Sequence, residues 1–261
     1  MCLVVVALDA HPRYSLVIAA NRDEYHARAA RTAQWGEDAP FADVLAGRDL
    51  EAGGTWLGVR RDGRWALLTN VRDGHRNHNP AAPSRGDLVP AVLNDRQVPA
   101  LALTELMRAA GTYNGFNLVA GDGSSATWVS NRTADTRTVV AGVHGLSNAL
   151  LDTPWPKVVQ TRGAIAAWAA RDVADLDPVF AALSDRTRAP DTALPATGVS
   201  LEWERLLSAP FIVSQDYGTR CSTVLVVDRN GAARFIERSY DASGKDIGEA
   251  DFAFDVVPQP D

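Results

Sequence analysis

The residue with the clearest chemical potential is the cysteine directly after the initiator methionine. Removal of Met1 would make Cys2 the N-terminal residue and leave a free α-amino group beside its thiol. Such an amino group titrates near ~8, so it can accept the proton of the thiol at neutral pH. Nucleophile and general base would then belong to one residue. Taken alone, however, Cys2 fits a small apolar residue at the start of a strand even better, since free cysteine is often buried.

A polar tetrapeptide, Asn21-Arg22-Asp23-Glu24, follows an apolar run at residues 15–20. If this run pairs with residues 2–8 in a hairpin, the tetrapeptide lies close to Cys2. Arg22 could then lower the pKa of the thiol, and the Asp23 carboxylate could hold the α-ammonium group. The same four residues are also compatible with a solvated turn.

Two asparagines and one arginine stand at the ends of further apolar runs. Asn70 and Asn148 each stand at the end of an apolar run. Arg220 stands just before the apolar run at residues 222–228. A carboxamide can donate to a developing oxyanion without carrying a charge, which is what acyl transfer requires. Arg220 could supply a cation beside the nucleophile. The alternatives are turn or cap roles for the asparagines and a surface salt bridge for the arginine.

Apolar runs between turn residues predict strands near both ends of the chain, with helices between them. The expected strands span residues 2–8, 15–20, 56–59, 64–69, 116–120, 126–130, 137–141, 211–214, 222–228 and 233–240. The expected helices span residues 87–93, 99–109 and 156–170, with a short helix within 178–195 and a long surface loop at 71–85. This order predicts an α+β layered fold rather than a βαβ repeat.

Composition and charge restrict the class of protein. The chain is 46% hydrophobic and 22% charged and has no internal repeat, which favours one domain over residues 1–261. A formal net charge of -6 argues against a nucleic-acid-binding surface. The N-terminus lacks the basic region and long apolar stretch of an export signal, and no segment reaches a membrane-spanning length. With only Cys2 and Cys221 present, we expect free thiols and a cytoplasmic location.

The sequence does not indicate a metal centre or a nucleotide-phosphate loop. Two cysteines and five scattered histidines argue against structural zinc. The Gly121-Asp122-Gly123 segment lies between two expected strands and opens no helix, so it matches neither a P-loop nor a dinucleotide fingerprint. We therefore expect no required cofactor and no metal, and a small-molecule substrate or ligand as the partner. The oligomeric state stays open.

Together these residues resemble the NRDE family, named for its Asn-Arg-Asp-Glu motif and also called the transport and Golgi organisation 2 family. The resemblance covers most of the chain. It is carried by blocks at residues 1–2, 21–24, 47–49, 53–58, 69–70, 84–86, 115–118, 145–148, 151–157 and 217–223.

The family is similar in layout to N-terminal-nucleophile hydrolases, especially the cysteine branch that includes choloylglycine hydrolases and penicillin V acylases. The resemblance implies a four-layer αββα sandwich with antiparallel sheets. It also implies a nucleophile, a contact to the α-amino group, two oxyanion donors and a supporting arginine. By position, these roles fall on Cys2, Asp23, Asn70, Asn148 and Arg220, respectively.

Two further residues are expected to bind substrate. Arg22 sits directly beside Asp23, whereas the early arginine of the cysteine branch stands a few residues before that aspartate. We expect Arg22 and Trp56 to contribute to substrate binding.

Two functions from different classes follow from this reading. The first is amide hydrolysis, in which the Cys2 thiol attacks a carbonyl and water then releases the acyl group. The second is binding or trafficking of haem or a lipid-like ligand, because the family has been connected with secretory-pathway organisation, lipid metabolism and haem trafficking. Iron could then be bound by Cys2 or by His26, His75, His78 or His144. A scaffold protein with a vestigial site is the third reading.

Overall fold

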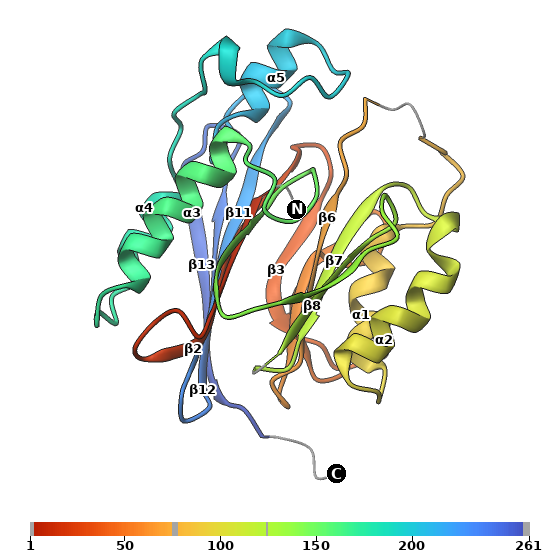
Figure 1. The fold of residues 1–261 in the computed structure, drawn as a ribbon, viewed down its shortest axis with the longest axis vertical. Helices are drawn as coiled ribbons and strands as arrows, with labels where there is room; N and C mark the ends of the chain where they lie inside the picture. The colour runs from red at the N-terminus through yellow and green to blue at the C-terminus, as the bar shows by residue number, and fades with distance from the viewer. Residues whose placement is uncertain (1–2, 75–77, 124, 258–261) are drawn as a thin grey trace.

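The computed structural model describes residues 3–74, 78–123 and 125–257. Two β-sheets lie face to face, and helices cover the outer face of each sheet (Figure 1). The predicted four-layer αββα sandwich with antiparallel sheets is therefore confirmed. Within the described ranges, no helix is both long enough and apolar enough to cross a membrane.

The first sheet has six antiparallel strands and contains both ends of the described chain. Its spatial order is β10 (Gly142–Leu146), β1 (Leu3–Leu8), β2 (Tyr14–Tyr25), β11 (Tyr217–Asp228), β12 (Ala232–Tyr240) and β13 (Asp246–Asp255). Strands β1 and β2 form the expected hairpin, and β11 pairs with β2 over almost its whole length. The β-branched and leucine residues of β1 are buried on both faces, as expected of a central strand.

The second sheet has seven antiparallel strands. Its spatial order follows the sequence: β3 (Ala30–Trp35), β4 (Val44–Asp49), β5 (Leu57–Arg60), β6 (Trp65–Asn70), β7 (Phe116–Gly121), β8 (Ala126–Ser130) and β9 (Thr136–Val139). The β5–β6 hairpin turns at Asp62-Gly63, where Gly63 has a φ of 87°, a conformation that glycine adopts readily.

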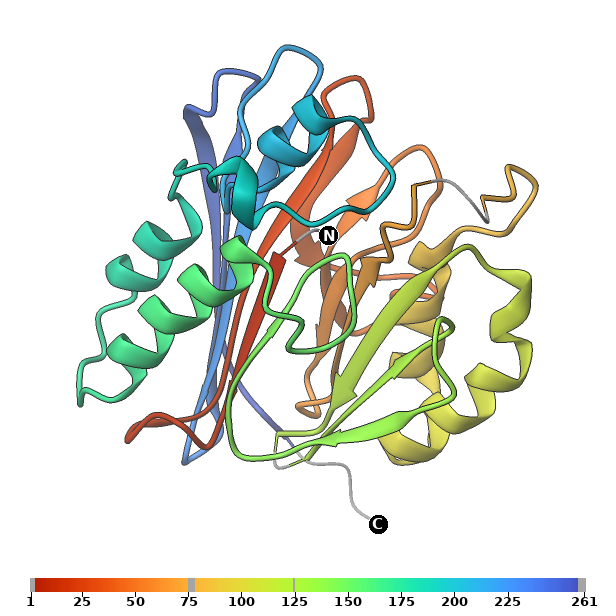
Figure 2. The same ribbon diagram turned by 45° about the horizontal axis from the view of Figure 1, so that its top comes forward.

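Three hydrophobic layers hold the sandwich together. The middle layer lies between the sheets and includes Ile18, Trp65 and Phe235. The second sheet packs on α1 (Leu88–Asn94) and α2 (Pro99–Leu106). The first sheet packs on α3 (Pro156–Ala169) and α4 (Asp177–Leu183). Helix α5 (Leu201–Leu207) and its flanking segments lie over one end of the molecule (Figure 2).

Several expected elements differ from the observed ones. The expected strand at residues 211–214 is wrong, because this segment is irregular and Ile212 bonds back to Thr219. Strand β2 continues through the polar tetrapeptide to Tyr25 instead of ending at residue 20. Helix α2 ends at Leu106 and continues as a 3₁₀ helix. The elements that the sequence reading did not anticipate are β3, β4, β10, β13 and α5.

Candidate active site

The candidate site forms where β1 begins. Leu3 is the first described residue and pairs with Asn21 of β2. Cys2, the expected nucleophile, lies outside the described residues, as does His75. Cys2 directly precedes Leu3 in the sequence, so the candidate site consists of the described side chains around the start of β1.

Asp23 is buried next to this strand end, with only 4% of its surface exposed. Its Oδ1 accepts a hydrogen bond of 2.7 Å from the Thr219 hydroxyl of β11. Its Oδ2 lies 4.0 Å from Nζ of Lys157, which projects from the first turn of α3. A carboxylate held in this way can receive a positively charged group at the start of β1.

Arg22 is also buried, and neighbouring residues of a strand face opposite sides of the sheet. Its Nη2 donates to Asp49 at 2.9 Å, and its guanidinium lies 4.5 Å from the ring centre of Trp56. Burial opposes ionisation of Asp49, but hydrogen bonds led by that of Arg28 outweigh it and lower the pKa of Asp49. The Arg22 guanidinium thus lies against the Trp56 ring and Asp49.

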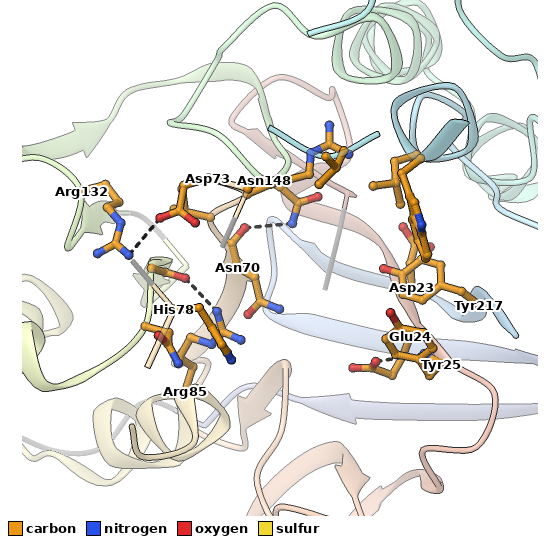
Figure 3. Close-up of a pocket in the computed structure, with 18 of the residues that line it drawn as sticks. Asp23, Glu24, Tyr25, Asn70, Asp73, His78, Arg85, Arg132, Asn148 and Tyr217 are labelled. Atoms are coloured by element: carbon orange, nitrogen blue, oxygen red, sulfur yellow. Dashed lines mark hydrogen bonds and ion pairs between the residues drawn. The ribbon is translucent and has the colours of Figure 1, made fainter. Parts of the chain in front are cut away.

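The two expected oxyanion donors meet at the ends of β6 and β10. Asn148 donates from Nδ2 to the main-chain oxygen of Asn70 at 2.9 Å (Figure 3). The Asn70 side chain has no hydrogen-bond partner among the residues that the structure describes, and it lines the cavity described below. The Asn70 carboxamide therefore lies at the cavity wall, whereas one N–H of Asn148 holds the end of β6.

Arg220 supports a turn. Its Nη1 donates to the main-chain oxygens of Tyr25, His26 and Arg28 at 3.1–3.3 Å. Burial lowers the pKa of Arg220, and the charge of Arg22 adds to this effect. Arg220 thus holds the main chain of the β2–β3 connection, which follows Asp23 in the sequence.

A cavity of about 690 Å³ opens beside these residues. Figure 3 shows Asp23, Glu24, Tyr25 and Tyr217 on one side, and Asn70, Asp73, His78, Arg85 and Arg132 on the other. A second cavity of about 620 Å³ adjoins it and includes Trp56. The residues common to both are Glu24, Arg28, Asn70, His78, Arg85 and Asn114.

The walls of the first cavity differ in character. On one side the ring of Tyr217 packs edge-on against Tyr25 and Trp203, with centroid distances of 5.2 and 5.4 Å. On the other side Arg132 pairs with Asp73 at 3.2 Å. The cavity can therefore hold a ligand with an apolar part and a hydrogen-bonding part, at a size typical of small-molecule sites.

Several of these residues were not anticipated from sequence: Lys157, Thr219, the aromatic wall and the Arg28–Asp49 pair. A signal existed for Lys157. Lysine is rare in this chain, and Lys157 follows the proline that opens α3, where the helix dipole disfavours a cation. Thr219 has no comparable local signal, because its partner Asp23 is far away in sequence.

Within residues 3–74, 78–123 and 125–257, no group of three His, Cys, Asp or Glu side chains is arranged to hold a metal ion.

The family described as Transport and Golgi organisation 2 matches residues 1–242. The chain belongs to this family. The Transport and Golgi organization protein 2 homolog of Bos taurus is 37% identical over 92% of this chain and 93% of its own length. The Homo sapiens homolog is 33% identical over the same shares of the two chains.

Two solved structures have a similar fold at low sequence identity. One is the Caenorhabditis elegans ortholog of N-acylethanolamine-hydrolyzing acid amidase, with a TM-score of 0.53 and 10% identity over 86% of this chain and 92% of that chain. Another is a mutant conjugated bile acid hydrolase of Clostridium perfringens, with a TM-score of 0.51 and 10% identity over 98% and 92%. These similarities show that the chain has the N-terminal-nucleophile hydrolase fold.

Proposed function

We propose that the protein is a cysteine N-terminal-nucleophile hydrolase that cleaves a small amide. After removal of Met1, the Cys2 thiol would attack the amide carbonyl and form a carbon–sulfur bond. The α-amino group would take the thiol proton and pass it to the departing amine as the carbon–nitrogen bond breaks. Water would then cleave the thioester, releasing a carboxylic acid and restoring the thiol.

The observation that carries this proposal is the position of Asp23 and Asn70 on one cavity beside the start of β1. Asp23 is a buried carboxylate suited to hold an α-ammonium group. Asn70 offers a carboxamide without a hydrogen-bond partner among the described residues, as an oxyanion donor must before the reaction. In this proposal Asn148 positions Asn70, and Arg220 positions the turn after Asp23.

The charges of the cavity support a ligand without a large excess charge. Three of the arginines that line it have carboxylate partners: Arg28 with Asp49, Arg72 with Glu204, and Arg132 with Asp73. Their charges are thus largely compensated. A neutral amide with one apolar side is compatible with a cavity whose charges are compensated in this way.

Intact mass spectrometry tests the proposal. We expect the purified protein to lack Met1 and to gain one acyl group at Cys2 when treated with p-nitrophenyl acetate. Cys2→Ala should abolish the adduct. Cys221→Ala is the matched control and should leave it unchanged, because complete burial raises the pKa of the Cys221 thiol and keeps it protonated. Retention of Met1 would contradict the proposal, since the amino group would then belong to the wrong residue.

Binding of haem or a lipid-like ligand without hydrolysis is the second candidate function. Among the histidines named for iron binding, His78 lines both cavities. His26 and His144 line neither cavity. His78 is therefore, among these described histidines, the one placed to act as an axial ligand to haem in the cavities.

A haem titration tests this alternative. Binding through His78 predicts a shifted haem absorption band in the wild type that is lost in His78→Ala. The Cys2→Ala variant shows whether the thiol is needed. An absorption spectrum that stays equal to that of free haem would exclude this function.

A further inference from the structure

Lys157 is a buried charge that the proposed reaction does not yet use. The chain has only two lysines, Lys157 and Lys245, among 26 basic residues. Lys245 is exposed, whereas only 1% of the surface of Lys157 is exposed. Nζ of Lys157 lies 4.0 Å from Oδ2 of Asp23.

Both the burial and the helix position of Lys157 disfavour a cation. Burial removes the hydration of the ammonium group. Lys157 is also the second residue of α3, where the helix dipole contributes positive potential. The Asp23 carboxylate is the charge that compensates for both effects, so the two side chains form an ion pair between β2 and α3.

In the proposed reaction Asp23 also interacts with the α-amino group of Cys2. The Asp23 carboxylate then balances two positive charges, the Lys157 ammonium and the protonated α-amino group. A nearby positive charge disfavours the protonated form of an amine. Other charged groups of the packed elements have partners of their own. On β2 and β11, Arg22 pairs with Asp49, Glu24 lies near Arg28, and Arg220 holds the turn. On β10 and α3, His144 and Arg162 lie against Asp152.

We propose that Lys157 is a positioning residue that orients Asp23 and lowers the proton affinity of the α-amino group of Cys2. This inference rests on the proposed function. The Lys157 charge keeps a larger fraction of the amine neutral near pH 7, which is the form that can accept the thiol proton. Lys157 thereby sets the pH at which the nucleophile becomes active, without contacting the substrate.

The pH dependence of Cys2 acylation tests this role. The rate of adduct formation with p-nitrophenyl acetate is measured by intact mass between about pH 5 and about pH 9. In Lys157→Met and Lys157→Gln, the rise of the rate with pH should move upward by roughly one pH unit. Below that rise the variants should therefore react about tenfold more slowly. Lys157→Arg keeps the charge and should restore the wild-type profile, and Lys245→Met is the matched control.

The outcomes separate the two proposals. Absence of a Cys2 adduct in the wild type would overturn the proposed function itself. A normal wild-type adduct with an unshifted profile in a folded neutral variant would overturn only the role of Lys157. Thermal unfolding shows which variants are folded.

If neither Lys157→Met nor Lys157→Gln folds, a measurement on the wild-type protein tests the role of Lys157 instead. In protein labelled with ¹⁵N-cysteine, the N-terminal amine is titrated by NMR. A midpoint below the ordinary value of about 7.7 supports the inference, and a midpoint at or above this value overturns it.

Discussion

Two buried carboxyl groups of the same sheet, Asp23 and Glu237, have contrasting surroundings. Glu237 of β12 lies between the two sheets, where it accepts hydrogen bonds from the Ala33 amide at 2.7 Å and the Thr223 hydroxyl at 3.2 Å. Burial raises the pKa of Glu237, and it lines neither of the two cavities at the candidate site. Asp23 of β2 has a hydroxyl partner as well, but it also has an ammonium group 4.0 Å away and a cavity beside it.

The difference shows what separates a structural acid from a candidate functional one. Burial and hydrogen bonds are common to both residues. The nearby ammonium group and the access to a ligand-sized space belong to Asp23 alone of the two. The following predictions test this contrast with matched substitutions.

The largest expected effect is on stability. Asp23→Asn leaves the buried Lys157 without its carboxylate and should lower the free energy of unfolding by about 3–5 kcal/mol. Glu237→Gln should cost about 1 kcal/mol or less, because the amide oxygen can accept from the Ala33 amide while the NH2 group donates to the Thr223 hydroxyl. Urea unfolding measures both. The double variant Asp23→Asn, Lys157→Met should recover part of the loss, and strictly additive losses would contradict the ion pair.

The next effect is on acylation of Cys2. Asp23→Asn should slow adduct formation by about 100-fold, the lower range for loss of a proton-transfer arrangement. Glu237→Gln should leave the rate within about twofold of the wild type, because Glu237 lines neither cavity. Both rates are measured by intact mass under conditions where the variants are folded. Equal effects of the two substitutions would remove the distinction between the two acids.

The smallest effect concerns pH and Glu237. Because its pKa is raised in the folded protein, folding favours the protonated carboxyl. Its stabilising contribution is present below the unfolded-state pKa of about 4.3 and is lost as the pH rises through the folded-state pKa. The unfolding free energy of the wild type should therefore fall relative to Glu237→Gln from about pH 4 to about pH 8. Urea unfolding at several pH values checks the sign, and a rise would contradict it.

The layered fold could be predicted from sequence because the central strands and α3 carry strong local patterns. The apolar run of β1 and the turn at Asp62-Gly63 are examples. Strand β13 could not be predicted in this way. Most of its side chains are exposed, so it lacks the apolar alternation that marks a strand, and its position depends on pairing with β12.

The site shows the same limit. Asn21 and Asp23 look like turn residues because their polar side chains follow an apolar run. They lie inside β2 instead, because β11 and α3 supply their partners from far along the chain. Local spacing cannot reveal such partners. The family resemblance named Asp23, but it did not single out Lys157.

Asn21 has a consequence for the segment that carries α5. Its Nδ2 donates to the main-chain oxygens of Leu183 and Pro210, and its Oδ1 accepts from Ser222. The Asn21 carboxamide thus connects the two ends of the segment at residues 184–209. This segment contributes Trp203 to the lining of the cavity. Because this segment is closed at its base, its residues can vary in sequence while the strand that carries Asp23 stays in register with β11.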